Sequence, residues 1–135
     1  ILILDEPTAG LDPKERIRIR NLISEVAKDK IVIIATHVVT DVEFIAKEIV
    51  MLSNGKIIRS GSPSKLLKEL DGKVWNIFLS DNEIDEVNTG YKVSNISRDA
   101  DGVIARIIAD SYDGRWQKEA VRPNLEDLYL YLNGD

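Results

Sequence analysis

Two apolar runs that flank one helical pattern constrain the fold of this chain most. Residues 1–4 and 31–35 are continuously apolar and rich in isoleucine. Runs without alternation are typical of strands that are covered on both faces, so we expect both strands to be buried. Between them, apolar side chains at helical spacing predict a helix over residues 14–28, with Ile17, Leu22, Ile23 and Val26 on or near one stripe. Strand, helix and strand in this order predict a βαβ unit with parallel strands and a right-handed crossover.

Composition limits the classes of protein to which the chain can belong. It has 135 residues, a formal net charge of -5 and no cysteine. This length suits one domain or pieces of two, and the acidic balance argues against a nucleic-acid partner. The lack of cysteine excludes disulfides and thiolate metal sites, and it fits a cytosolic location. No apolar run approaches the ~18 residues that a membrane span requires, so a partner would have to supply any spanning helices.

Polar side chains follow both predicted strands at the point where each strand ends. Asp5 and Glu6 come directly after the first strand, and Thr36 and His37 follow the second. Ligands of open parallel sheets bind outside the carboxyl ends of the strands. A lone histidine is more often structural than catalytic, but His37, the only histidine, would lie at the same edge as the two carboxylates. The sequence therefore predicts a functional site at this edge.

The first twelve residues, ILILDEPTAGLD, resemble a motif of ATP-binding cassette (ABC) transporter ATPases. In that family the motif LLLLDEPTxGLD forms the Walker B strand and the D-loop, and a single histidine after the next strand forms the H-loop. The resemblance is specific for residues 1–13 and 35–37 and continues to about residue 71. It implies an α/β fold, namely the C-terminal part of a P-loop NTPase (RecA-like) core with parallel strands.

The resemblance also implies a role for each of these side chains, with ATP and Mg²⁺ as cofactors. Asp5 would hold the Mg²⁺ ion, through water, since magnesium prefers hard oxygen ligands and keeps several waters. Glu6 would act as the general base that orients the attacking water. His37 would contact the terminal phosphate. Asp5, Glu6 and His37 are thus the expected nucleotide-binding residues, and Glu6 and His37 the expected catalytic ones.

The loop after the carboxylate pair is the expected contact with a partner. Ala9, Gly10, Leu11 and Asp12 match the D-loop, which would touch a second ATP-binding subunit in a head-to-tail dimer. Asp12 precedes Pro13, so it could also be a plain helix cap, and both roles can hold. The family further implies a transmembrane permease as partner and a cytoplasmic position, peripheral on the inner face of the cell membrane.

Two motifs that a complete cassette needs are absent from the sequence. No Gly-x-x-x-x-Gly-Lys-Ser/Thr loop occurs, and neither does the family's Leu-Ser-Gly-Gly-Gln signature. We therefore interpret the chain as the C-terminal part of a longer ATPase and expect the isolated chain to be inactive. The alternatives are a soluble ABC ATPase of translation or DNA repair, and a non-catalytic interaction or regulatory module.

The chain divides into two expected domains, a core part over residues 1–71 and a small α+β accessory domain over 72–135. The core part should also contain a helix over 40–47, a hairpin turning at Asn54-Gly55 and a helix over 64–70. The second domain should contain a strand over 74–79, a short helix over 81–87, a hairpin of 91–97 with 103–109, and a last helix capped by Asn124. Residues 122–129 are similar to the ending of some exporter ATPases, which favours export.

Overall fold

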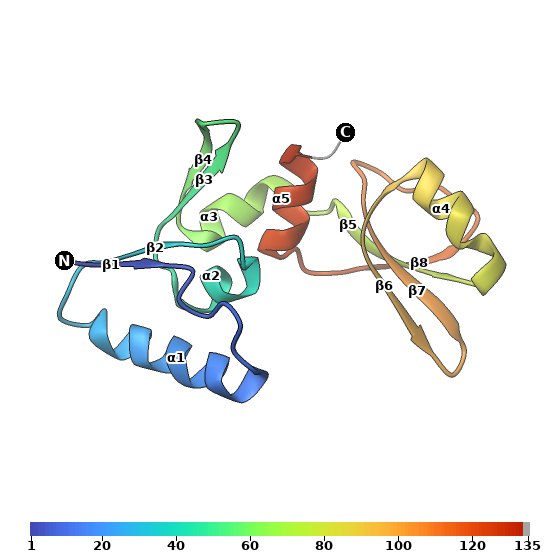
Figure 1. Cartoon of the computed structure of the whole chain (residues 1–135). Helices are drawn as coiled ribbons and strands as arrows, with labels where there is room; N and C mark the ends of the chain where they lie inside the picture. Colours follow the sequence, from blue (N-terminus) through green and yellow to red (C-terminus); the bar gives the residue numbers. More distant parts are fainter. Residues whose placement is uncertain (134–135) are drawn as a thin grey trace.

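The computed structural model describes residues 1–133 and has a mixed α/β architecture (Figure 1). Its strands form three sheets: β1-β2, β3-β4, and a four-stranded sheet of order β6-β7-β5-β8. The last two residues of the predicted accessory domain, 134–135, lie outside the described residues. The helices and strands of the first half position the candidate site, and those of the second half form a separate small sheet with its own core.

The predicted βαβ unit is present at the start of the chain. Strand β1 (Leu2–Asp5) pairs in parallel with β2 (Val32–Ala35), and α1 (Pro13–Val26) connects them. Helix α1 begins where predicted, because the Asp12 side chain accepts a hydrogen bond from the Glu15 amide at 2.9 Å. Within residues 1–133 parallel pairing is limited to β1 and β2, since the other two sheets are antiparallel. A larger parallel core is therefore not confirmed.

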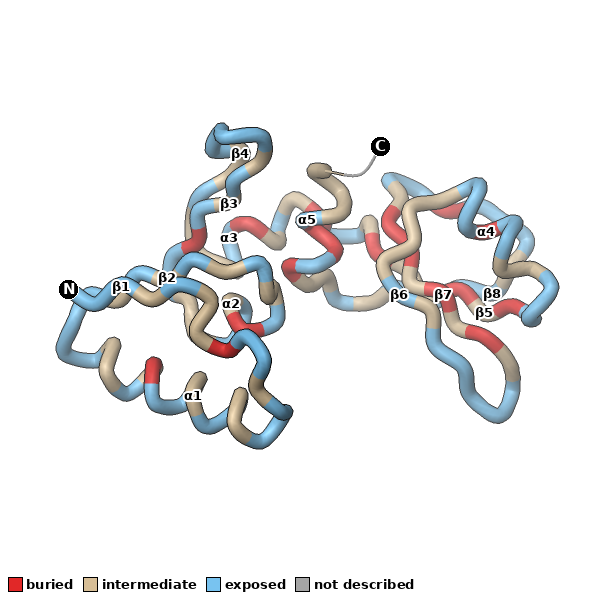
Figure 2. The backbone as a smooth tube through the Cα atoms, in the orientation of Figure 1, coloured by how far each residue is buried: buried red, intermediate tan, exposed pale blue. Residues whose placement is uncertain are grey.

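The expected burial of this unit is wrong for the described residues. Ile3 is 71% exposed and Ile33 is 52% exposed, and the tube in Figure 2 is pale blue along much of both strands. A sheet of two strands gives each side chain few neighbours, and the remaining elements leave much of it open to solvent. On α1 only Ile23 is buried, while Ile17 and Leu22 of the predicted stripe are about half exposed.

The rest of the first half follows local sequence signals. Helix α2 (Val39–Ile45) comes directly after the His37 loop, and β3 (Ile49–Ser53) and β4 (Lys56–Gly61) form the predicted hairpin. Its turn residues Asn54 and Gly55 have φ angles of 50° and 75°, the left-handed values of a type I′ turn. Helix α3 and the 3₁₀ helix η1 then cover the predicted helical segment (Pro63–Leu67 and Lys68–Leu70).

The second half is an antiparallel sheet with one short helix. The predicted strand, short helix and hairpin are all present. Strand β8 was not predicted, since Gln117–Ala120 shows no apolar alternation and its pairing with β5 is a tertiary contact. The elements are β5 (Val74–Leu79), η2 (Asp81–Glu83), α4 (Ile84–Gly90), β6 (Lys92–Asp99), β7 (Gly102–Ile108) and β8 (Gln117–Ala120).

The last helix, α5 (Leu125–Asn133), packs against both halves of the chain. It contacts α2 and α3 on one side and β6 on the other, between the two parts of Figure 1. Leu125 and Leu128 of α5 share one buried cluster with Ile49 and Leu66 of the first half and Val74 of the second. The expected boundary near residue 71 remains a prediction, and α5 joins the two predicted domains through a common core.

Candidate functional site

The carboxyl ends of β1 and β2 bring the predicted site residues to one edge. The register of the strands aligns Asp5 with Ala35, and the Glu6 amide donates to the Ala35 carbonyl at 2.8 Å. Glu6, Thr36 and His37 therefore leave the sheet side by side. This juxtaposition follows from the parallel pairing that the sequence pattern predicts.

The Glu6 carboxylate is the centre of a small hydrogen-bond network. The Nδ1 atom of His37 lies 2.8 Å from Oε1 of Glu6, and the His37 amide donates to the same oxygen at 3.1 Å. The Thr36 hydroxyl donates to Oε2 at 3.0 Å. The hydrogen bond from the His37 ring is the largest influence and lowers the pKa of Glu6, against an opposing effect of desolvation and with further lowering by Thr36 and the His37 amide. Glu6 is thus held as a carboxylate, the form that can accept a proton from water.

The backbone of Glu6 is in an unusual conformation for a residue with a side chain. Its φ angle is 47°, in the left-handed region, which costs a non-glycine residue about 1–2 kcal/mol. The hydrogen bonds of its amide and carboxylate to residues 35–37 hold it there. Strained residues that the surroundings fix in this way cluster at functional sites.

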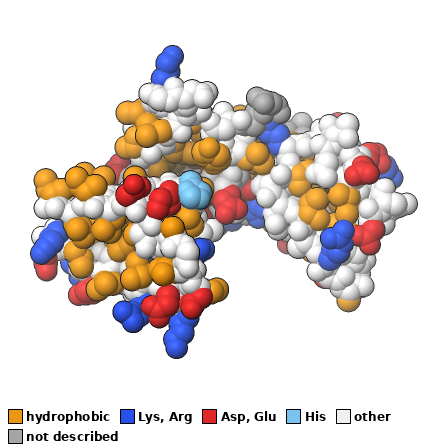
Figure 3. All heavy atoms as spheres, viewed as in Figure 1, with side chains coloured by type: hydrophobic (Ala, Val, Ile, Leu, Met, Phe, Trp, Pro, Cys, Tyr) orange, Lys and Arg blue, Asp and Glu red, His pale blue; other side chains and the backbone are white. Residues whose placement is uncertain are grey.

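Solvent can reach these groups. The His37 side chain is 85% exposed and that of Glu6 is 33% exposed. Figure 3 shows the histidine beside acidic side chains on the front face, next to the apolar surface of the first half. The site is therefore a surface edge on which a ligand could sit.

Asp5 fits the role of a ligand to a hydrated cation. It is exposed at the end of β1, and within residues 1–133 its carboxylate has no hydrogen bond or ion pair. No group of three acidic or histidine side chains in the described chain could hold a metal ion by itself. Since Mg²⁺ binds through one or two carboxylates, waters and phosphate oxygens, Asp5 could supply the protein's share of such a site.

The predicted D-loop forms two successive turns that lead into α1. The Ala9 amide donates to the Glu6 carbonyl at 3.2 Å, and the Leu11 amide donates to the Thr8 carbonyl at 3.3 Å. Ala9 and Gly10 are exposed, as a contact with a partner would require. Asp12 caps helix α1, which is one of the two roles predicted for it, and its role at an interface stays a prediction.

One buried polar cluster beside the site was missed from the sequence. The Thr8 hydroxyl donates a hydrogen bond to the Asp41 carboxylate, and Arg20 of α1 lies 3.6 Å from the same carboxylate. Thr8 and Asp41 are 1% and 3% exposed. The cluster ties the D-loop to α1 and α2. The signal that could have revealed it is spacing, because Asp41 lies four residues before the partly buried Ile45 and so shares its helix face.

The matches among known proteins point to one family. Over 83 residues the chain is 41% identical to human ATP-binding cassette sub-family A member 9, covering 62% of this chain and 5% of that protein. It is 38% identical over 66 residues to ABC transporter A family member 8 of Dictyostelium discoideum, covering 49% of this chain and 8% of that protein. It is 42% identical over 72 residues to the energy-coupling factor transporter ATP-binding protein EcfA2 of Lactococcus lactis, covering 53% of this chain and 25% of that protein. No family model matches the chain.

These comparisons confirm the resemblance to ABC transporter ATPases. About half to 60% of the chain is similar to ABC transporter ATP-binding proteins. The chain matches at most about a quarter of the length of these three relatives. Across residues 1–133, no helix is both long and apolar enough to cross a membrane.

Proposed function

We propose that this chain contributes the residues that bind Mg²⁺ and activate the attacking water in the ATP-hydrolysing site of an ABC transporter ATP-binding subunit. The observation that carries this proposal is the contact between Glu6 and His37, 2.8 Å apart at the carboxyl edge of a parallel strand pair. Phosphoryl transfer depends mainly on positioning and on stabilisation of charge, and this edge brings together the Glu6 carboxylate, the His37 imidazole and the free Asp5 carboxylate. The similarity to ABC transporter ATP-binding proteins supports the same conclusion.

Each residue has a separate task in this proposal. Asp5 holds hydrated Mg²⁺, which when bound neutralises charge on the phosphates. Glu6 accepts the proton of the attacking water, and its lowered pKa keeps it in the carboxylate form. His37 contacts the terminal phosphate. Thr36 orients Glu6 through the hydroxyl hydrogen bond.

The whole subunit extends this account beyond the chain. Residues 1–71 would belong to the P-loop NTPase core, with its parallel RecA-like sheet, and residues 72–135 to a small accessory domain. The D-loop, from Ala9 to Asp12, would meet a second ATP-binding subunit in a head-to-tail dimer. The dimer would act on the cytoplasmic face of the membrane and drive a permease, with export as the direction. Because this sequence has no phosphate-binding loop or signature, the chain alone should not turn over MgATP.

The roles can be separated by two substitutions in the complete ATP-binding subunit. Asp5→Asn should raise the Mg²⁺ concentration needed for half-maximal ATP hydrolysis by about tenfold or more, since the charged ligand is lost. His37→Ala should lower kcat while leaving that Mg²⁺ requirement unchanged. Titration of ATP hydrolysis with Mg²⁺ measures both effects. An unchanged Mg²⁺ requirement in Asp5→Asn would contradict the role of Asp5, and normal kcat in His37→Ala would contradict that of His37.

A further inference from the structure

A chain of polar contacts connects the small C-terminal sheet to the helix that follows His37. Its centre is Asp127 of α5, which is completely buried. Arg106 of β7 donates to both carboxylate oxygens of Asp127, with its Nη2 atom 2.6 Å from Oδ2 and its Nε atom 3.0 Å from Oδ1. The Ser94 hydroxyl of β6 also donates to Oδ1 at 2.8 Å. A buried carboxylate that is paired with an arginine and hydrogen-bonded in this way fixes α5 on the sheet.

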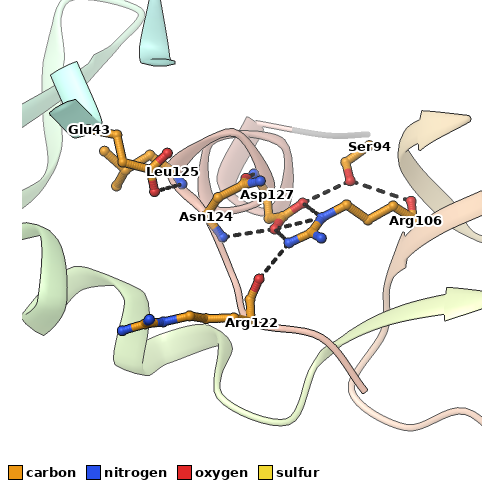
Figure 4. A network of polar contacts seen from close by, with 7 residues as sticks. All are labelled: Glu43, Ser94, Arg106, Arg122, Asn124, Leu125 and Asp127. Carbon is orange, nitrogen blue, oxygen red and sulfur yellow. Dashed lines mark hydrogen bonds and ion pairs between the residues drawn. The ribbon is translucent and has the colours of Figure 1, made fainter. Parts of the chain in front are cut away.

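The same carboxylate orders the start of α5. The Asn124 amide donates to Oδ2 of Asp127 at 2.9 Å, and the Asp127 amide donates to the Asn124 side chain at 2.9 Å. Arg106 Nη2 also donates to the Arg122 carbonyl at 2.6 Å. Figure 4 shows these groups converging on the first turn of α5. The first turn is thus tied to β6 and β7.

The first turn of α5 then reaches the first half of the chain. The Leu125 amide donates to the Glu43 carboxylate of α2 at 3.3 Å, the contact on the left of Figure 4. Beside it, Val39 and Val42 of α2 and the following Ala46 pack against the buried cluster that contains Leu125 and Leu128. The inward apolar face of α2 therefore rests on α5.

Helix α2 depends on such contacts. It has seven residues and no side-chain hydrogen bond at its N-cap Val38, and a helix of this length is not stable by itself. It begins two residues after His37, so any shift of α2 moves the loop that pairs with Glu6. Contacts with α5, with Arg20 of α1 and with Thr8 of the D-loop stabilise it, and the Val38 amide donates to the Thr36 hydroxyl at 3.0 Å.

We infer that Glu43 and Asp127 are positioning residues through which the C-terminal sheet sets the place of His37 against Glu6. The inference rests on the proposed function only for the role of His37 at the phosphate, because the contacts themselves are present without nucleotide. A partner or ligand that displaced α5 would release α2 and separate His37 from the carboxylate. The C-terminal sheet thereby sets the geometry of the nucleotide site without a direct contact with the nucleotide.

The test uses the chain as it is, in the absence of nucleotide, and follows His37 by NMR. Two signals report on its position: the exchange rate of its amide, which donates to Glu6, and the ring signals, which are unambiguous because the chain has one histidine. Glu43→Ala and Arg106→Lys should each speed exchange of the His37 amide by about fivefold or more and shift the ring signals. Glu43→Gln keeps an acceptor for the Leu125 amide and should stay within about twofold of the wild type.

The control is Arg98→Gln, which breaks the exposed Arg98–Asp81 pair in the same sheet without touching α5. It should leave the His37 signals unchanged. Unaltered His37 signals in folded Glu43→Ala would overturn the inference. So would an effect of Glu43→Ala without one of Arg106→Lys, because the coupling would then not run through Asp127, and so would an equal effect of Arg98→Gln. Failure of the proposed function is a distinct result, namely ATP hydrolysis at the wild-type rate in the complete subunit with Glu6→Gln.

Discussion

At the scale of single residues, the site is organised by the number of donors that one carboxylate receives. Glu6 accepts hydrogen bonds from the Thr36 hydroxyl, the His37 amide and the His37 ring. These donors stabilise the charged form of Glu6. Because the carboxyl ends of parallel strands lie at one edge of a sheet, the sequence predicts that Asp5, Glu6 and His37 lie at the same edge. It does not predict their hydrogen bonds, nor the contact of Thr8 with Asp41, because these depend on how loops and helices pack.

The donors differ in their expected influence on the pKa of Glu6. Replacing the largest of them, by His37→Ala, should raise the pKa of Glu6 toward its ordinary value, and Thr36→Val should raise it by less. The carboxyl ¹³C signal of Glu6, followed by NMR as a function of pH, measures both. An equal pKa in the wild type and His37→Ala would show that the two side chains do not pair in solution.

Glu83 is a second residue whose environment predicts a pH dependence. The side chain and amide of Ser80, followed by the Trp116 indole, lower the pKa of Glu83 from 4.5 to about 2. A carboxyl with a depressed folded-state pKa contributes stability above its unfolded pKa and loses it as the pH falls through the folded pKa. The difference in Tm between the wild type and Glu83→Gln should therefore be largest above pH 4.5 and shrink as the pH falls to about 2.

The matched control for this effect is Glu86→Gln. Glu86 shares Arg115 with Glu83 but is mostly exposed, and the hydrogen bonds that Ser80 and Trp116 make to a carboxylate go to Glu83. Its difference from the wild type should be small throughout the same range of pH, as for most surface ion pairs. If Glu83→Gln behaved in the same way as this control, the contacts of Glu83 would not contribute to stability.

At the scale of elements, those with local signals were predictable and those without were not. The Asn54-Gly55 turn, the Asp12 cap and the Asn124 cap all occur where the sequence predicts them. Strand β8 carries no such signal, since its edge position and polar side chains remove the usual alternation. The packing of α5 on α2 also has no local signal, because its partners are about eighty residues apart.

The cap of α5 gives a quantitative test at this scale. Asn124→Ala removes the side-chain acceptor of the Asp127 amide, so the free energy of unfolding should fall by about 1 kcal/mol. Asn124→Ser keeps an acceptor and should cost only a few tenths of that value. Urea unfolding of the two variants and the wild type measures the difference. Equal midpoints for Asn124→Ala and the wild type would contradict the cap.

At the scale of the whole molecule, the exposed apolar surface of the first half is the dominant property. Figure 3 shows it over the region of β1 and α1. Besides Ile3 and Ile33, the exposed positions include Val50, Leu52 and Ile57 of the hairpin. Apolar strands with open edges favour association with other chains. The continuous apolar runs at residues 1–4 and 31–35 are typical of strands covered on both faces, and the described residues do not supply that cover.

We therefore expect the chain to self-associate in a concentration-dependent way. A charge in this sheet, introduced by Ile33→Lys, should reduce the mass measured by light scattering at a given concentration. Asn88→Lys on α4 adds the same charge at an exposed polar position and should leave the association unchanged. A wild-type chain that stays monomeric at all concentrations would contradict the expectation.

The central claim is that Glu6 activates water at a nucleotide site that it shares with Asp5 and His37. The most direct measurement is ATP binding and phosphate release by the complete ATP-binding subunit with Glu6→Gln. The substitution keeps the shape of the side chain and removes the base, so ATP should still bind, hydrolysis should fall by about a hundredfold or more, and a nucleotide-bound dimer should accumulate. Turnover at the wild-type rate in Glu6→Gln would contradict the account.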